Sequence, residues 1–233
     1  MKAHLVKTLY FEAAHRNAHG NEAQQRLHGH SYKVDLLGGG APSPEIGWVV
    51  DFVEFKRLFQ PLYEQLDHAY LNELHGLEQD TRLPALREWM LQALPARPPW
   101  FWDLRLSIAG DCAFRATKLP ADPFADLPER IRFTTESAQS LPQLPSGHPC
   151  RKIHGHSYRF ELGATDTAGL QAVLGTLYET LDHRYLNEVP GLECATCERI
   201  CVWLWEWVKQ RGLEPTVTVV QETETARCIY YGE

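Results

Sequence analysis

The sequence predicts an α+β protein made of two tandem copies of one unit, and two observations support this. The first is an internal repeat: the segment 28–32 (HGHSY) recurs at 154–158, and 63–68 recurs in altered form at 178–183. This period is longer than the roughly 20–50 residues of solenoid repeats, so it indicates a domain duplication. The second is the order of hydrophobic patterns within each copy, in which segments with strand spacing flank segments with helical spacing. We therefore expect each copy to form a four-stranded antiparallel sheet with two helices on one face.

The elements of the first copy follow from hydrophobic spacing. Residues 32–36 alternate between apolar and polar, which predicts a strand that carries the HGH segment. A helix is predicted next, from an apolar stripe at helical spacing. The stripe consists of Phe52, Phe55, Leu58, Phe59, Leu62 and Leu66. Asp51 is the expected N-cap of this helix, with Glu54 as its capping-box partner.

The second copy shows the same order. Its first helix is predicted from Leu170, Val173, Leu174, Leu177 and Leu181, and its second from Ile200, Trp203, Leu204 and Trp207. A terminal strand is predicted over 216–220 (TVTVV). The proline-rich stretch 117–129 (TKLPADPFADLPE) reads as the linker between the copies. We therefore expect an N-terminal unit over 1–118 and a C-terminal unit over 129–233.

Composition excludes several classes of function. The chain has 233 residues and a formal net charge of −7, and it has no basic run of the kind that nucleic-acid binders show. It also lacks the apolar stretches that predict a secretory signal or a membrane span. We expect a cytoplasmic protein without nucleic-acid or membrane partners, and its six cysteines should be free thiols.

Three histidines of the first copy form a predicted metal site. His28 and His30 are two residues apart on a strand, so their side chains share one face. His15 follows the strand-like segment 9–11, and an antiparallel pairing of the two strands brings it to the same place. Three imidazoles and a water form the open coordination of catalytic zinc. The sequence therefore predicts Zn²⁺ bound by these three side chains.

Longer motifs resemble the 6-pyruvoyl-tetrahydropterin synthase / 6-carboxytetrahydropterin synthase family. They are the segments 11–15 (FEAAH), 28–32, 47–52 (GWVVDF), 66–68 (LDH) and 71–72 (LN), with 181–193 and 221–233 in the second copy. The second-copy segments are similar to the carboxy-forming branch, which acts in queuosine precursor synthesis. The resemblance implies the tunnelling fold (T-fold), zinc held by three histidines, a small-molecule pterin substrate and closed ring-shaped oligomers. The usual substrate of the family is 7,8-dihydroneopterin triphosphate.

The resemblance also implies roles for individual residues. It places the metal on His15, His28 and His30. A cysteine base beside an Asp–His pair corresponds to Cys150, with Asp67 and His68 in the first copy and Asp182 and His183 in the second. The glutamate that anchors the pterin ring corresponds to Glu222.

Each copy departs from the family pattern. In the first, Gln24 stands where the family has its cysteine, and no glutamate corresponds to Glu222. Glu22 is a nearby alternative base. In the second, alignment on Phe133 puts Ser137 in place of the first zinc histidine, and His148 is an alternative ligand. The copies lack different parts, which suggests a composite site in which Asp182, His183 and Glu222 reach the zinc across an interface.

These features leave three functions open. The first is a zinc-dependent pterin lyase of the family type, a carbon–oxygen lyase. The second is a non-catalytic pterin- or purine-binding protein. The third is an aldolase- or epimerase-like pterin enzyme that does not need the cysteine. For each we expect a homo-oligomer, and three tandem chains would supply the six units of a homohexamer.

Overall fold

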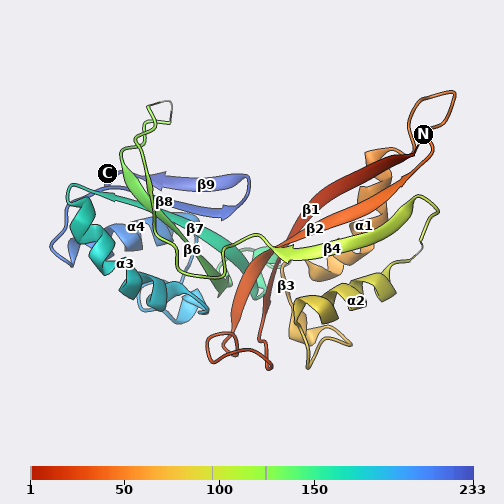
Figure 1. The fold of residues 1–233 in the computed structure, drawn as a ribbon. Helices are drawn as coiled ribbons and strands as arrows, with labels where there is room; N and C mark the ends of the chain where they lie inside the picture. Colours follow the sequence, from red (N-terminus) through yellow and green to blue (C-terminus); the bar gives the residue numbers. More distant parts are fainter. Residues whose placement is uncertain (1, 96, 124) are drawn as a thin grey trace.

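The computed structural model describes residues 2–95, 97–123 and 125–233, and it contains two sheets, each with its own pair of helices (Figure 1). The first sheet has the order β3-β1-β2-β4 and the second β5-β6-β7-β8-β9. Of the predicted linker 117–129, residue 124 lies outside the described residues. Among those described, no helix is long and apolar enough to cross a membrane.

The first sheet is built from two long strands and two short partners. Its elements are β1 (Ala3–His15), β2 (His28–Gly40), α1 (Phe52–Leu66), β3 (Ala69–Tyr70), the 3-10 helix η1 (Leu71–Glu73), α2 (Leu83–Ala93) and β4 (Phe101–Ile108). The β1–β2 and β2–β4 pairs are antiparallel, whereas the two-residue β3 runs parallel to β1. The prediction of four antiparallel strands is therefore wrong for this half.

The second sheet has five strands. Its elements are β5 (Thr117–Leu119), β6 (Arg130–Gln139), η2 (Pro149–Arg151), β7 (His154–Ala164), α3 (Thr167–Leu181), η3 (Leu186–Glu188), α4 (Cys197–Lys209), β8 (Pro215–Thr223) and β9 (Ala226–Tyr230). All four pairs of neighbouring strands are antiparallel. The fifth strand is β5, which lies inside the predicted linker and pairs with β6.

Each sheet packs against its helices around a separate hydrophobic core. The stripe predicted for the first copy lies on α1 and is buried from Phe55 to Leu66, but Phe52 at its start is 47% exposed. Asp51 caps α1 by accepting from the backbone N–H of Val53. The expected capping box does not form, because the Glu54 carboxylate accepts from Arg57 instead.

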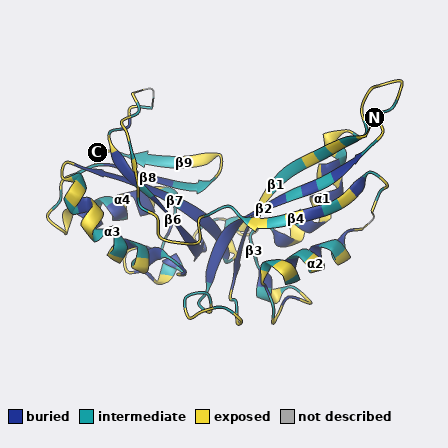
Figure 2. Cartoon of the chain, viewed as in Figure 1, coloured by how far each residue is buried: buried dark blue, intermediate teal, exposed yellow. Residues whose placement is uncertain are grey.

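The two sheets meet where their HGH segments cross. The last residues of β1 and β6 and the first of β2 and β7 are buried, and Figure 2 shows this buried region at the centre of the molecule. A Cβ added to Gly29 would lie 2.2 Å from the Cα of Gly155, and one added to Gly155 would lie 2.1 Å from the Cα of Gly29. The central glycine of each HGH segment therefore allows the two backbones to touch.

Candidate metal centre

The three histidines predicted to bind zinc lie together at the end of the first sheet. The β1–β2 register places His15 opposite His28, and His30 lies on the same face of β2. The Nε2 atoms of His15 and His30 are 2.9 Å apart. One ligand atom from each of the three histidines lies within 4.8 Å of the others. The structure thus brings together a set of three imidazoles that could hold one ion.

The outer nitrogen of each ring has a partner that orients it. His15 Nδ1 lies 2.8 Å from Thr81 Oγ1, which donates its own hydrogen to the Arg16 carbonyl and so accepts from the ring. His28 Nδ1 donates to the Arg26 carbonyl at 2.8 Å. With Nδ1 protonated, the Nε2 lone pairs face the centre, as metal-bound histidines require.

Burial keeps these rings neutral. It is the main cause that lowers the pKa of His15 well below the usual value, and it also lowers the pKa of His28. For His30, burial and the nearby His183 lower the pKa to about 3. A neutral imidazole is the form that binds a transition metal, so the donor set fits zinc.

An Asp–His pair from the second half faces the triad. The ring of His183 lies over that of His28, with their centroids 4.3 Å apart. His183 Nδ1 is 2.7 Å from Asp182 Oδ2, and the backbone N–H of His183 donates to the Glu136 carbonyl. His183 has a φ of 52°, in the left-handed region that non-glycine residues rarely adopt. Such backbone conformations persist where the surroundings impose them, often at functional sites.

A cavity of about 520 Å³ opens over the triad and the Asp182–His183 pair. This volume is in the range of small-molecule sites. Gln24, Arg82 and Cys112 also line the cavity. Arg82 forms an ion pair with Asp80, whereas Glu22 is exposed and pairs with Arg26 outside the lining. Cys112, which the sequence did not single out, comes from the segment after β4.

The second histidine pair has a glutamine in the position of the third ligand. The β6–β7 register places Gln139 opposite His154, as His15 lies opposite His28. The alignment of Ser137 with His15 is therefore wrong. Two additional residues, Thr134 and Thr135, separate Phe133 from the glutamate that corresponds to Glu12. His148 is exposed and accepts from the Cys150 N–H, so it caps η2 and is not part of the metal-ligand clusters found.

Cys150 and the first-half Asp–His pair lie beside this second histidine pair. Cys150 Sγ is 3.4 Å from His68 Nε2, and His68 Nδ1 is 2.8 Å from Asp67 Oδ2. The His68 ring lies 4.4 Å from that of His154, so the arrangement mirrors His183 over His28. Cys150 thus meets the Asp–His pair of the other half, away from the three-histidine site.

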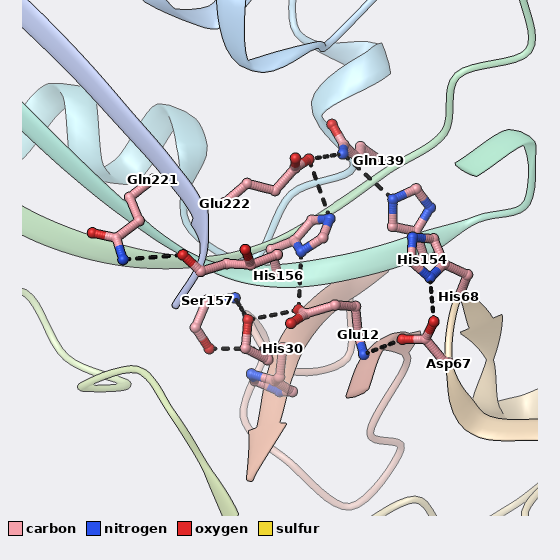
Figure 3. A network of polar contacts seen from close by, with 12 residues as sticks. Glu12, His30, Asp67, His68, Gln139, His154, His156, Ser157, Gln221 and Glu222 are labelled. Atoms are coloured by element: carbon pink, nitrogen blue, oxygen red, sulfur yellow. Dashed lines mark hydrogen bonds and ion pairs between the residues drawn. The ribbon is translucent and has the colours of Figure 1, made fainter. Parts of the chain in front are cut away.

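Glu222 also lies at the second histidine pair (Figure 3). Its Oε1 is 3.2 Å from His156 Nε2, and it accepts from the amide of Gln139. Within one chain, therefore, Asp182 and His183 lie at the three-histidine site but Glu222 does not.

Two glutamates that the sequence did not single out link the sites. Glu136 of the second half accepts from His30 Nδ1 at 2.6 Å, and Glu12 of the first half accepts from His156 Nδ1 at 2.9 Å. Burial raises the pKa of Glu136 to about 8. Ser157 donates to Glu136 and Ser31 donates to Glu12. Glu12 lies opposite Ser31 and Glu136 lies opposite Ser157, and this equivalence is visible only once the strand register is known.

Comparison with known proteins identifies the family. The profile of the family described as 6-pyruvoyl tetrahydropterin synthase matches residues 4–98 and 130–233, which is most of the chain. The chain belongs to this family. It is 36% identical over 95 residues to the 6-carboxy-5,6,7,8-tetrahydropterin synthase of Synechocystis, which covers 39% of this chain and 73% of that protein.

A curated relative and a solved structure add to this comparison. The dihydroneopterin monophosphate aldolase of Pyrococcus furiosus is 32% identical over 74 residues, which is 32% of this chain and 61% of that protein. Among solved structures, the 6-pyruvoyl tetrahydropterin synthase of Caenorhabditis elegans is 16% identical, with a TM-score of 0.38 over 47% of this chain and 96% of that one. Family membership rests on the sequence match.

Proposed function

We propose that this protein is a zinc-dependent pterin-converting lyase of the 6-carboxy/6-pyruvoyl-tetrahydropterin synthase type, acting on 7,8-dihydroneopterin triphosphate or a related pterin. The observation that carries the proposal is the cavity in which three oriented histidines face the Asp182–His183 pair. The names of the relatives support pterin as the substrate class. The proposal includes both the identity of the bound metal as zinc and the type of product formed.

Zinc would be held by His15, His28 and His30 through Nε2. Bound there, it would polarise the side-chain oxygens of the substrate and make an adjacent C–H bond more acidic. The protein groups around the triad fix the ring orientations in advance, which lowers the cost of assembling the site.

We assign proton transfer in this cavity to His183. Asp182 accepts from its Nδ1, so Nε2 carries the lone pair that can take a proton from the substrate. The amide of Gln24 has no comparable basicity. Cys112 is exposed as a residue, yet desolvation of its thiol and the carboxylates of Glu136 and Asp182 raise its pKa to about 12. It is therefore a thiol near neutral pH, and the imidazole is the better base.

Glu222 does not line this cavity, because its carboxylate contacts Gln139 and His156 at the second histidine pair. It therefore cannot anchor a pterin in the cavity of the same chain. The pterin-anchoring role proposed for it would need the other histidine pair or another chain. The lining supplies Asn17 and Asn21 as polar groups that could bind the ring edge.

The test is incubation of zinc-loaded protein with 7,8-dihydroneopterin triphosphate, with triphosphate release followed by chromatography. His183→Ala should lower the rate by roughly 10²-fold or more, as expected for loss of a general base. His75→Ala is the matched control, because this histidine is exposed at the surface and away from the cavity.

The Cys150→Ala variant shows at which of the two histidine clusters the substrate is converted. If it abolishes release while His183→Ala does not, the reaction belongs to the second histidine pair and its Cys150–His68–Asp67 group. If none of the variants or the wild type releases triphosphate, the lyase proposal is wrong.

A second candidate is a pterin-binding protein without lyase activity, which the amide of Gln24 at the position of the family cysteine favours. Binding of the pterin without triphosphate release would support it. An aldolase-like reaction is the remaining alternative, and it would show as side-chain cleavage of a dihydroneopterin without elimination of phosphate.

We also propose that the chain is a tandem of two T-fold units, over 1–118 and 129–233. The equivalent registers of β1–β2 and β6–β7 support this division, as do the two matched segments. Because β5 pairs with β6, residues 117–119 belong to the second sheet although they lie at the proposed boundary.

A further inference from the structure

The second histidine pair, His154 and His156, keeps the ring geometry of the corresponding pair in the three-histidine site. The rings of His154 and His156 have centroids 5.1 Å apart and an interplanar angle of 87°, against 5.0 Å and 87° for His28 and His30. Both rings are buried. The pair is thus arranged as in the complete triad, although the third histidine is absent.

The outer nitrogens of this pair are also held as in the triad. His154 Nδ1 donates to the Lys152 carbonyl at 2.8 Å, and His156 Nδ1 donates to Glu12 at 2.9 Å. Both Nε2 atoms then carry lone pairs that face a common point, where His154 Nε2 lies 3.4 Å from the amide nitrogen of Gln139. This orientation by outer partners is typical of metal-binding histidines.

An unsatisfied contact lies at that common point. His156 Nε2 is buried and has no hydrogen-bond partner, although Glu222 Oε1 lies 3.2 Å away. A lone pair facing a carboxylate oxygen at this distance is repulsive unless a cation lies between them. Two ligands bonded to one tetrahedral ion at 2.0–2.2 Å lie about 3.4 Å apart, close to the separation observed.

We propose that His154, His156 and Glu222 bind a second divalent transition-metal ion in each chain. Ligand atoms of these three residues lie within 4.8 Å of one another. Gln139 stands in place of the third histidine, and its amide nitrogen contacts both Glu222 and His154 Nε2, so an ion bound here would displace this amide from His154. The site therefore has two nitrogens and one oxygen, in place of the three nitrogens of the first site, and zinc and iron(II) are the ions that this set suits.

Two other arrangements use some of the same groups. In one, a proton on His156 Nε2 joins it to Glu222 without any metal, with Glu12 on the other side of the ring. In the other, the ion is held by His68, Cys150 and His154, whose ligand atoms also lie within 4.8 Å of one another. The variants below distinguish these arrangements from the proposed set.

The test is the metal content of full-length protein, stripped with chelator, reloaded with Zn²⁺ and measured by elemental analysis. Wild type should hold about two ions per chain and His28→Ala about one, since the second site is independent of the triad. Glu222→Gln should also hold about one, and the double variant about none. Glu224→Gln is the matched control, because this carboxylate of the same chain segment pairs with Arg159 away from the histidines.

Each outcome decides the assignment. Cys150→Ala should keep about two ions per chain, and loss of an ion in this variant together with retention in Glu222→Gln would overturn the ligand set. One ion per wild-type chain, lost in His28→Ala, would show that a proton joins His156 to Glu222. Gln139→His should restore a three-histidine set, so that the second ion no longer depends on Glu222. These readouts do not depend on lyase activity, so failure of the proposed function leaves them interpretable.

Discussion

Gly29 and Gly155 are the residues that allow the two halves to come into contact. Their backbones touch, and a methyl group on Gly29 would overlap the Cα of Gly155 at 2.2 Å. Because the obstacle is backbone on both sides, neither side chain rotation nor repacking relieves it. The histidines of both HGH segments flank these glycines in the sequence, so we expect the geometry of the crossing to influence how each Asp–His pair faces the histidines of the other half.

We therefore expect Gly29→Ala to destabilise the protein by about 1–3 kcal/mol and to weaken metal binding at the triad. Thermal unfolding and zinc titration measure the two effects. Gly175→Ala is the matched control: this glycine is inside α3 with no atom near an added Cβ, so the change should stabilise the helix by about 0.5–1 kcal/mol. Wild-type stability and zinc affinity in Gly29→Ala would contradict the close contact.

Glu161 gives a prediction for pH. It is 2% exposed and accepts from both Arg130 and Arg132. Burial raises its pKa, but the hydrogen bonds from the two arginines outweigh it and hold the pKa below the ordinary 4.5. A depressed pKa in the folded state means that this stabilisation is complete above about pH 4.5 and is lost as the pH falls through the folded value.

Glu161→Gln should therefore lower stability at neutral pH by on the order of 3 kcal/mol, because Arg130 stays buried without its counter-ion. Below pH 4.5 its stability should depend less on pH than that of the wild type. Urea unfolding at several pH values measures both. Glu224→Gln, which removes a more exposed ion pair with Arg159, should change stability by less than about 1 kcal/mol. Parallel pH curves for Glu161→Gln and wild type would show that this carboxyl has an ordinary pKa.

At the residue scale, sequence reasoning found the groups that local spacing can reveal. His28 and His30 alternate on one strand, and a single strand pairing brings in His15. It missed Glu12 and Glu136, because their contacts with His156 and His30 join residues of different copies. It also placed Ser137 where Gln139 lies, since a phenylalanine match cannot detect the two additional residues that the hydrogen-bond register reveals.

At the scale of elements, the start of α4 differs from the start of α2. Thr196 caps α4 by accepting from the N–H of Arg199, whereas Arg82 at the start of α2 makes no side-chain cap. Thr196→Ala should cost about 1 kcal/mol, because one terminal N–H loses its acceptor, and Thr196→Ser should cost little. Urea unfolding measures the difference. An equal loss in both variants would point to the methyl group of Thr196 instead of its hydroxyl.

Helices were easier to predict than strand partners for a physical reason. The stripe on α1 and its Asp51 cap are encoded within one continuous segment. The three-residue β5 exists only because it pairs with β6, and its proline-rich surroundings indicated a linker. The capping box failed because Arg57 competes for Glu54, a choice between two local partners that the pattern does not settle.

At the scale of the whole molecule, the first sheet has a face that its helices do not cover. Along β1, Leu5 and Leu9 pack into the core, so the alternate residues Val6 and Tyr10 point the other way and are 54% and 39% exposed. Because β3 pairs only with residues 13–14 of β1, nothing among the described strands pairs with the outer edge of the rest of β1, or with that of β4 or β9. An open edge beside exposed apolar residues is a template for association with another chain.

We expect three chains to join through these edges, which puts six sheet-and-helix units around common axes and gives a particle of about 80 kDa from a chain of 26.6 kDa. Light scattering after size exclusion measures the mass. Val6→Lys with Tyr10→Lys should yield single chains that keep their fold, because both positions are exposed within the chain and the charges repel an apolar neighbour. Ile46→Lys, at an exposed position in the loop before α1, should leave the mass unchanged. A wild-type mass of one chain would show that the open face serves something other than self-association.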